Sequence, residues 1–189
     1  LALNQDGRLV LGGSKGLSLW SGKGEPQCVV AEHEGEQLNF NDMTVSERGE
    51  VYGGTFYWGE SGMERHGKLY IIRLDGSIAV LDEGIQLSNG SGFSPDHETF
   101  YFTDTMARTI FAYDVDRSTG NLARKRVLVH VPSDEGLPDG LTVDAEGFIW
   151  SAQWYGAQVV RYDPEGKVER RVQLPVQQVS SVAFGGVNL

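Results

Sequence analysis

The sequence predicts an all-β protein, a β-propeller built from four-stranded blades. Apolar residues fall in short runs rich in β-branched and aromatic side chains, and Gly, Asp, Pro or Ser bounds each run, which is typical of strands joined by turns. No apolar pattern extends over the ten or more residues expected of a helix. Turn signals recur every 42 to 50 residues, which is the period of a propeller blade.

The first half of each blade is predicted as an inner strand, a four-residue turn and a second strand. The turns are NQDG (4–7), SERG (46–49), SPDH (94–97) and DAEG (144–147). The second strands follow at 8–13, 50–56, 98–105 and 148–154, and the inner strands precede the turns at 1–3, 43–45, 91–93 and 141–143. One such sheet cannot bury both faces alone, so blades must stack on neighbours.

A second hairpin completes each blade, at 17–30, 69–81, 110–129 and 159–174. A fifth inner strand is expected at 180–186. Residues 1–189 therefore form a single β-propeller domain of about four blades plus a partial one, which we expect to be incomplete at both ends. Either the chain is part of a longer protein, or a homo-oligomer covers the open blade edges.

The composition excludes several classes of partner. The net charge of -10 argues against nucleic acid, because phosphate binding needs clustered Lys and Arg. The chain has no apolar run near the length of a membrane helix and no leader-like start, so no membrane partner is expected. Cys28 is the sole cysteine, which excludes an internal disulfide and fits a reducing, cytoplasmic location.

Three side chains with oxygen atoms stand in one register. Asn41, Asn89 and Asp139 each lie eight residues before the end of their blade's first turn, and the fifth unit offers Ser180. Inner strands of a propeller line its central channel, so equivalent positions form part of a ring. Carbonyl and carboxylate oxygens suit Ca²⁺, Mg²⁺ or Mn²⁺, with Zn²⁺ as a further option. The alternative interpretation is local, because Asn, Asp and Gly are also favoured in turns before strands.

The sequence resembles the gluconolactonase and senescence marker protein (regucalcin) family, which is built on a six-bladed β-propeller. The similar stretches are 1–13, 39–56, 87–105, 137–168 and 174–186, in the family's order. The resemblance implies one divalent metal in the channel, Ca²⁺ foremost. Its ligands would be a Glu of the first blade, the Asn of the SNG motif (Asn89) and the Asp of the PDG motif (Asp139). Asp139 would also transfer the proton, and Asn41 of the FND motif would contact the substrate.

The chain departs from the family pattern in two places. The blade with the metal-binding Glu and most of the last blade have no counterpart, and Asn39 stands where many lactonases carry Arg. Asn39 is therefore a candidate substrate-binding residue, but it cannot form the two parallel hydrogen bonds that a guanidinium gives to an acid's oxygens. The sequence therefore does not predict a preference for sugar lactones.

The expected function is metal-dependent hydrolysis of a small lactone or related ester. The metal would polarise the ester carbonyl, and Asp139 would accept a proton from the attacking water. One alternative is a phosphotriesterase or another esterase on the same site. The other is a calcium-binding or interaction propeller fragment without catalytic activity.

Overall fold

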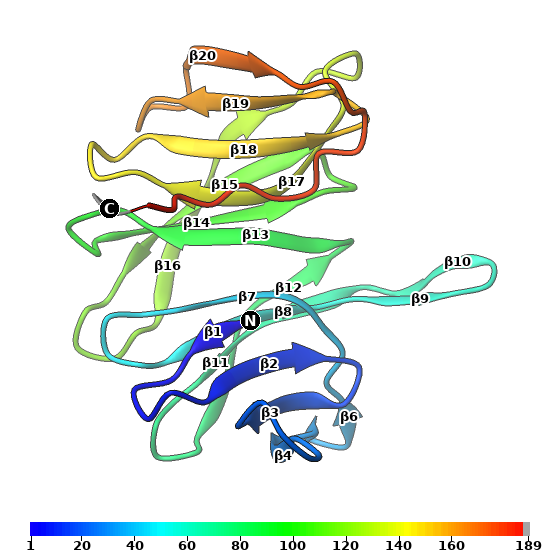
Figure 1. The fold of residues 1–189 in the computed structure, drawn as a ribbon, viewed down its shortest axis with the longest axis vertical. Coiled ribbons are helices and arrows are strands. Elements are labelled where there is room, and N and C mark those ends of the chain that lie inside the picture. The colour runs from blue at the N-terminus through cyan, green and yellow to red at the C-terminus, as the bar shows by residue number, and fades with distance from the viewer. Residues whose placement is uncertain (187–189) are drawn as a thin grey trace. The chain divides into compact units, whose positions relative to one another are not determined.

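A computed structural model describes residues 1–186, and this range is all-β, as predicted (Figure 1). Its twenty strands are arranged mainly in four-stranded sheets, and in three of these four sheets the strands are consecutive along the chain. No helix in the described range is long and apolar enough to cross a membrane. The chain divides into two compact units, residues 1–88 and the residues from 89 onward.

The first unit contains two four-stranded sheets. One has the order β1 (Ala2–Leu3), β2 (Leu9–Gly13), β3 (Gly16–Trp20) and β4 (Gln27–Val30), and the other consists of β7 (Phe40–Val45), β8 (Val51–Thr55), β11 (Gly67–Ile72) and β12 (Ile78–Ile85). Two short hairpins were not predicted, namely β5 (Glu32–His33) with β6 (Glu36–Gln37), and β9 (Tyr57–Gly59) with β10 (Gly62–Arg65). The second of these projects as the cyan ribbon in Figure 1.

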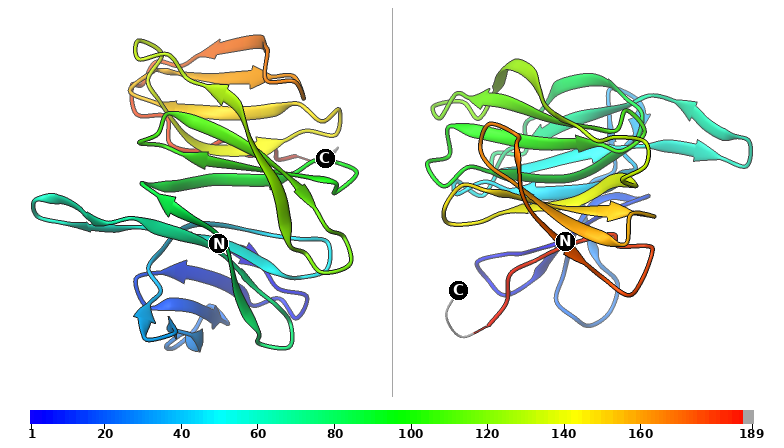
Figure 2. Two further views of the ribbon diagram at one scale, coloured as in Figure 1. Left: turned by 180° about the vertical axis from the view of Figure 1, so that it is seen from behind. Right: turned by 90° about the horizontal axis from the view of Figure 1, so that it is seen from above.

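The second unit contains the other two four-stranded sheets. Their strands are β13 (Ser88–Phe93), β14 (Thr99–Asp104), β15 (Thr109–Val115) and β16 (Leu122–His130), followed by β17 (Leu137–Val143), β18 (Ile149–Trp154), β19 (Gln158–Tyr162) and β20 (Val168–Gln173). The sheets are neighbours in both views of Figure 2. Between them lies one apolar core, to which Tyr101 and Ile110 contribute from one sheet and Leu141, Ile149 and Val160 from the other.

The predicted fifth inner strand at 180–186 is wrong. This segment has no strand pairing in the described range, although the Gly140 N–H donates to the Ser180 carbonyl at 2.9 Å. Val179 and Val182 instead pack over Ala152. An inner strand is held by the second strand of its own blade, and residues 1–186 supply no such partner for this segment.

The four predicted turns form with their last residue in the left-handed region. Gly7, Gly49 and Gly147 have φ values of 84°, 83° and 86°, and His97 adopts 58° at the same place. A glycine is favoured there because it has no Cβ to clash with the backbone. The turns therefore have one backbone shape in all four blades, even where the sequence replaces glycine.

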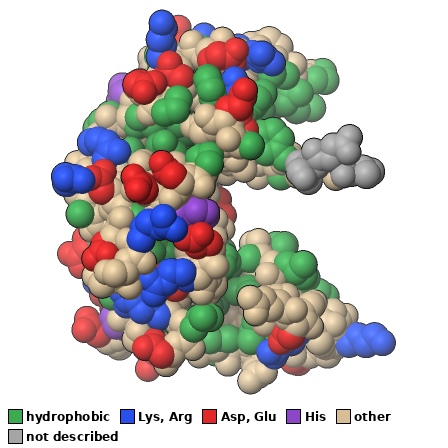
Figure 3. Space-filling view, turned by 90° about the vertical axis from the view of Figure 1, so that its left-hand side faces the viewer, with side chains coloured by type: hydrophobic (Ala, Val, Ile, Leu, Met, Phe, Trp, Pro, Cys, Tyr) green, Lys and Arg blue, Asp and Glu red, His purple; other side chains and the backbone are tan. Residues whose placement is uncertain are grey.

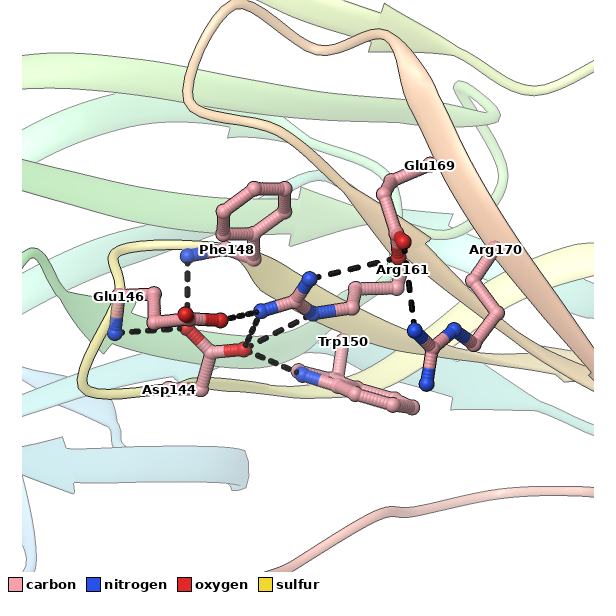
Figure 4. Close-up of polar contacts among 7 residues, drawn as sticks. All are labelled: Asp144, Glu146, Phe148, Trp150, Arg161, Glu169 and Arg170. Carbon is pink, nitrogen blue, oxygen red and sulfur yellow. Dashed lines mark hydrogen bonds and ion pairs between the residues drawn. The ribbon is translucent and has the colours of Figure 1, made fainter.

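Asp144 and Arg161 form a polar cluster that joins a turn to three strands (Figure 4). The Asp144 Oδ2 atom accepts from the Arg161 Nε and Nη2 atoms at 2.9 and 2.6 Å and from the Trp150 Nε1 atom at 2.9 Å. Arg161 also pairs with Glu146 and Glu169 at 2.5 and 3.3 Å. The cluster therefore fixes the turn 144–147 against β18, β19 and β20.

Candidate functional site

Asn41, Asn89 and Asp139 lie inside inner strands, not in turns before them. They are the second residue of β7, the second of β13 and the third of β17. The pairing is irregular at two of these places, between Phe40 and Asp42 and between Pro138 and Leu141. Such irregularities redirect side chains and are common beside functional sites. The interpretation of these residues as local turn formers is therefore wrong, because their backbone is part of a sheet.

Glycines allow the inner strands of the second unit to approach one another. A Cβ atom at Gly90 would lie 2.0 Å from the Leu141 nitrogen and 2.8 Å from the Asp139 carbonyl oxygen. At Gly140 it would lie 2.7 Å from the Ser180 carbonyl oxygen. Only glycine permits such backbone contacts. The sequence thereby brings the strand of Asn89 against the strand of Asp139.

A buried hydroxyl joins Asn89 to the strand that carries Asp139. The Asn89 Nδ2 atom donates to the Thr105 Oγ1 atom at 2.7 Å. That hydroxyl in turn donates to the Pro138 carbonyl oxygen, also at 2.7 Å. Thr105 is only 4% exposed, whereas Asn89 and Asp139 are half-buried. The amide and the backbone next to the carboxylate are therefore held by the same side chain.

Arg108 organises the segment that leads into β17. Its Nε atom donates to the Val131 carbonyl oxygen at 3.0 Å, and its Nη2 atom donates to the carbonyl oxygens of Pro132 and Gly136. A guanidinium presents five N–H groups in a rigid plane, so it can hold several carbonyls at once. Arg108, which lies outside β17, thus fixes where this strand begins and thereby where Asp139 lies.

The other two candidates belong to the first unit. Asn41 is exposed, and its Nδ2 atom donates to the Ser88 carbonyl oxygen at 2.7 Å. Asn39 is half-buried, and its Nδ2 atom donates to the Phe56 carbonyl oxygen at 3.1 Å. The Asn39 carbonyl also accepts from the Phe56 N–H. Asn39 therefore ties two segments of the first unit together, a role that the sequence did not suggest.

Asp42 is a second carboxyl in an inner strand, and it was not among the predicted residues. Its Oδ1 atom accepts from the Met43 N–H at 2.7 Å. Burial raises the pKa of Asp42 above its ordinary value, and this hydrogen bond opposes the shift. A half-buried carboxyl beside Asn41 adds a titratable group to the start of β7.

The side chains of the second unit offer oxygen donors of the kind that hard cations prefer. Asp139 contributes a carboxylate and Asn89 an amide carbonyl, and both fit Ca²⁺ or Mg²⁺ as part of a shell completed by other oxygens. Within residues 1–186, no group of three or more His, Cys, Asp or Glu is arranged to hold a metal. The two oxygen donors, from Asp139 and Asn89, are therefore one charged carboxylate and one neutral amide.

Thr105 is a second residue of the candidate site, besides Asp42, that was not predicted from the sequence. It is the last residue of the run FYFTDT (100–105), and a polar residue at the end of an apolar strand was the available signal. Its partners lie 16 and 33 residues away along the chain, so no local pattern could identify them.

Comparisons with known proteins agree on one family. Residues 1–189 match the family model described as SMP-30/Gluconolactonase/LRE-like region. Pentonolactonase XacC of Haloferax volcanii is 42% identical over 79% of this chain and 50% of its own length. Human regucalcin is 33% identical over 100% of this chain and 65% of its own.

Solved structures extend the likeness to the fold. A calcium-binding regucalcin from Agrobacterium tumefaciens superposes with a TM-score of 0.86 and 28% identity, over 98% of this chain and 63% of that one. A gluconolactonase from Xanthomonas campestris gives a TM-score of 0.83 with 27% identity, over 97% and 64%. The chain thus spans about half to two thirds of the length of the proteins it matches.

Proposed function

Since the chain belongs to the SMP-30/gluconolactonase/LRE-like family, we propose that it hydrolyses lactones with the help of one divalent metal in its channel. The observation that carries the proposal is the placement of Asn89 and Asp139 on adjacent inner strands, linked through Thr105. The names of two relatives support the substrate class, because one is a pentonolactonase and another a gluconolactonase.

Asn89 and Asp139 are the residues of this chain that would hold the metal. Ca²⁺ is the first candidate, since one similar structure is that of a calcium-binding protein, and Zn²⁺, Mg²⁺ and Mn²⁺ are the alternatives. The bound cation would withdraw electron density from the lactone carbonyl and offset the charge that develops on its oxygen. The amide of Asn89 adds a ligand oxygen without adding negative charge.

Asp139 would act as the proton acceptor. As the oxygen of a water molecule bonds to the lactone carbonyl carbon, the Asp139 carboxylate takes a proton from that water. The bond between the carbonyl carbon and the ring oxygen then breaks, and the proton passes to the ring oxygen, which gives a hydroxy acid. Asn41 would orient the lactone, and Asn39 would contact it as a neutral group.

Activity of the Asp139→Asn variant tests this proposal. We expect the rate of lactone hydrolysis to fall by roughly 100-fold or more, because general-base catalysis contributes about that much. The Asp163→Asn variant is the control, since the Asp163 carboxylate accepts backbone hydrogen bonds within an exposed turn. A chelator should remove the wild-type activity and added Ca²⁺ should restore it. Undiminished hydrolysis by Asp139→Asn would refute the assignment of this residue.

A phosphotriesterase or another esterase activity is the second candidate. The observation in its favour is Asn39, whose amide replaces a cation and donates to the Phe56 carbonyl. A neutral pocket wall would discriminate less strongly for acidic sugars. Parallel assays with sugar lactones, simple esters and phosphotriesters separate these activities. A chain that binds Ca²⁺ but hydrolyses none of them would be a binding or interaction propeller.

The remaining expectations concern the surroundings of the protein. On the face drawn in Figure 3, Lys and Arg side chains lie among Asp and Glu side chains, which supports the proposal that nucleic acid is not a partner. A cytoplasmic location and a homo-oligomer that covers open blade edges stay predictions. Light scattering measures the latter directly, and a monomer would contradict it.

A further inference from the structure

We propose that Thr105 is a positioning residue that fixes which end of the Asn89 amide faces the metal. This inference rests on the proposed metal site and deepens it. The relevant contacts are the 2.7 Å hydrogen bond from the Asn89 Nδ2 atom to the Thr105 Oγ1 atom and the 2.7 Å bond from that hydroxyl to the Pro138 carbonyl oxygen.

The number of protons on the hydroxyl decides the direction of the first contact. A threonine hydroxyl has one hydrogen to donate and two lone pairs that accept. The Pro138 carbonyl can only accept, so it takes that single hydrogen. Towards Asn89, the hydroxyl can therefore act only as an acceptor. The end of the amide that faces Thr105 must be the NH₂ group, and the amide oxygen must face away from it.

Burial makes this preference strong. Thr105 is 4% exposed and Pro138 is buried. If the Asn89 amide turned over, its oxygen would meet the hydroxyl oxygen with no hydrogen between them. Buried polar atoms without partners are unfavourable because water cannot reach them. One orientation of the amide is therefore selected before any cation arrives.

The selected orientation suits a hard cation. Ca²⁺ and Mg²⁺ bind amide oxygens, whereas an NH₂ group presents hydrogens with partial positive charge. The second bond of Thr105 ends on the residue that precedes Asp139. The same hydroxyl thus governs the amide ligand and the backbone beside the carboxylate ligand.

Calcium titration of Thr105 variants tests the inference. Thr105→Val keeps the shape of the side chain but removes the hydroxyl, and we expect it to weaken Ca²⁺ binding by roughly tenfold or more, as for other residues that orient metal ligands. Thr105→Ser keeps the hydroxyl and should stay within about twofold of wild type. Thr103→Val is the matched control: Thr103 is buried like Thr105, but within residues 1–186 its hydroxyl has no hydrogen-bond partner, so binding should not change.

The Asn89→Asp background separates orientation of the amide from general damage. A carboxylate presents an oxygen in either orientation, so Thr105 cannot select between two orientations in this variant. We expect Thr105→Val to change the Ca²⁺ affinity of Asn89→Asp by less than about twofold. An equal loss in both backgrounds, or a loss in Thr105→Ser as large as in Thr105→Val, would overturn the inference.

A measurement on the metal-free wild type keeps the inference independent of the proposed function. Nuclear Overhauser effects between the Asn89 NH₂ protons and the Thr105 methyl protons are expected, because the NH₂ group is held next to Thr105. If they are present and the wild type binds no Ca²⁺, the metal site is wrong but the orientation stands. If they are missing, the orientation is wrong whatever the titration gives. Because this measurement uses the wild type alone, it decides the question even if Thr105→Val does not fold.

Discussion

Both oxygens of the Asp144 carboxylate are used within the second unit. Its Oδ1 atom accepts from the backbone N–H groups of Glu146 and Phe148 at 3.0 and 2.9 Å, and its Oδ2 atom accepts from Trp150 and Arg161. Burial alone would raise the pKa of Asp144. Together, the hydrogen bonds from Trp150, Arg161 and Phe148 outweigh burial and hold it below its ordinary value. The ionised form therefore stabilises the folded chain.

Stability should accordingly depend on pH through Asp144. Because its pKa is lower in the folded than in the unfolded state, the stabilisation is fully present above a pH of about 4 and is lost as the pH falls through the folded-state pKa. Asp144→Asn should lower the free energy of unfolding at pH 7 by about 2 kcal/mol. The loss relative to wild type should shrink as the pH falls below about 4, towards the lowered folded-state pKa of Asp144.

Urea unfolding at several pH values measures this dependence. The control is Asp134→Asn, which changes an exposed aspartate and should follow the wild-type profile. A constant difference between Asp144→Asn and wild type at every pH would show that ionisation of Asp144 does not contribute.

The two glycines of the inner strand β13 differ in what surrounds them. At Gly90 an added Cβ would meet the backbone of β17 at 2.0 Å. At Gly92, in the same strand, it would meet only the side chains of Val143 and Leu141, at 3.3 and 3.5 Å. Backbone cannot retreat without breaking the sheet, whereas side chains can shift slightly.

Alanine substitutions should therefore have very different effects along this strand. Gly90→Ala is expected to lower the free energy of unfolding by about 3 kcal/mol or more, or to prevent folding. Gly92→Ala should change it by less than about 1 kcal/mol. Denaturant midpoints compare the two variants, and similar midpoints would contradict the close approach of β13 and β17.

Local and distant interactions explain what the sequence could predict about the strands. The hairpins of the four-stranded sheets were predictable, since apolar alternation and Asp-Gly or Pro-Glu-Gly turns act over a few residues, whereas the two short hairpins β5–β6 and β9–β10 were not. The start of β17 was not, because LPDG has the composition of a turn and becomes strand through contacts with another blade. The opposite error was made at 180–186, because its apolar pattern is typical of a strand but no strand within residues 1–186 pairs with it.

In the candidate site, too, the sequence predicts the repeated positions but not the long-range contacts. The common register of Asn41, Asn89 and Asp139 was visible in the spacing of the turns. The bond between Thr105 and Pro138 joins residues 33 positions apart, and nothing near either residue in the sequence encodes it. Ligand candidates can therefore be predicted from a repeat, but the side chains that orient them depend on how blades pack.

The chain as a whole is strongly acidic. It carries 26 Asp and Glu against 16 Lys and Arg, for a net charge of -10. A charge of this size produces a negative potential that attracts cations and repels polyanions. Added salt screens that potential, because the Debye length falls from about 30 Å at 0.01 M to about 10 Å at 0.1 M.

Calcium affinity should therefore decrease as the ionic strength rises. We expect a several-fold weaker affinity at about 0.1 M than at about 0.01 M salt, beyond any effect on folding. Calorimetric titrations in sodium chloride and in choline chloride measure it, and agreement between the two salts excludes competition by Na⁺. An affinity independent of salt would show that distant carboxylates do not contribute.

The location of Asn89-Gly90 within β13 has a consequence for chemical ageing. Asn-Gly is the dipeptide most prone to deamidation, in which the glycine nitrogen attacks the side-chain carbonyl carbon to form a cyclic imide. The strand backbone of β13 and the bond from the amide to Thr105 disfavour the closed arrangement of these atoms that the attack requires. The folded chain should therefore resist deamidation at Asn89, while unfolding should start it. Isoaspartate at this position would record how often β13 has opened during storage.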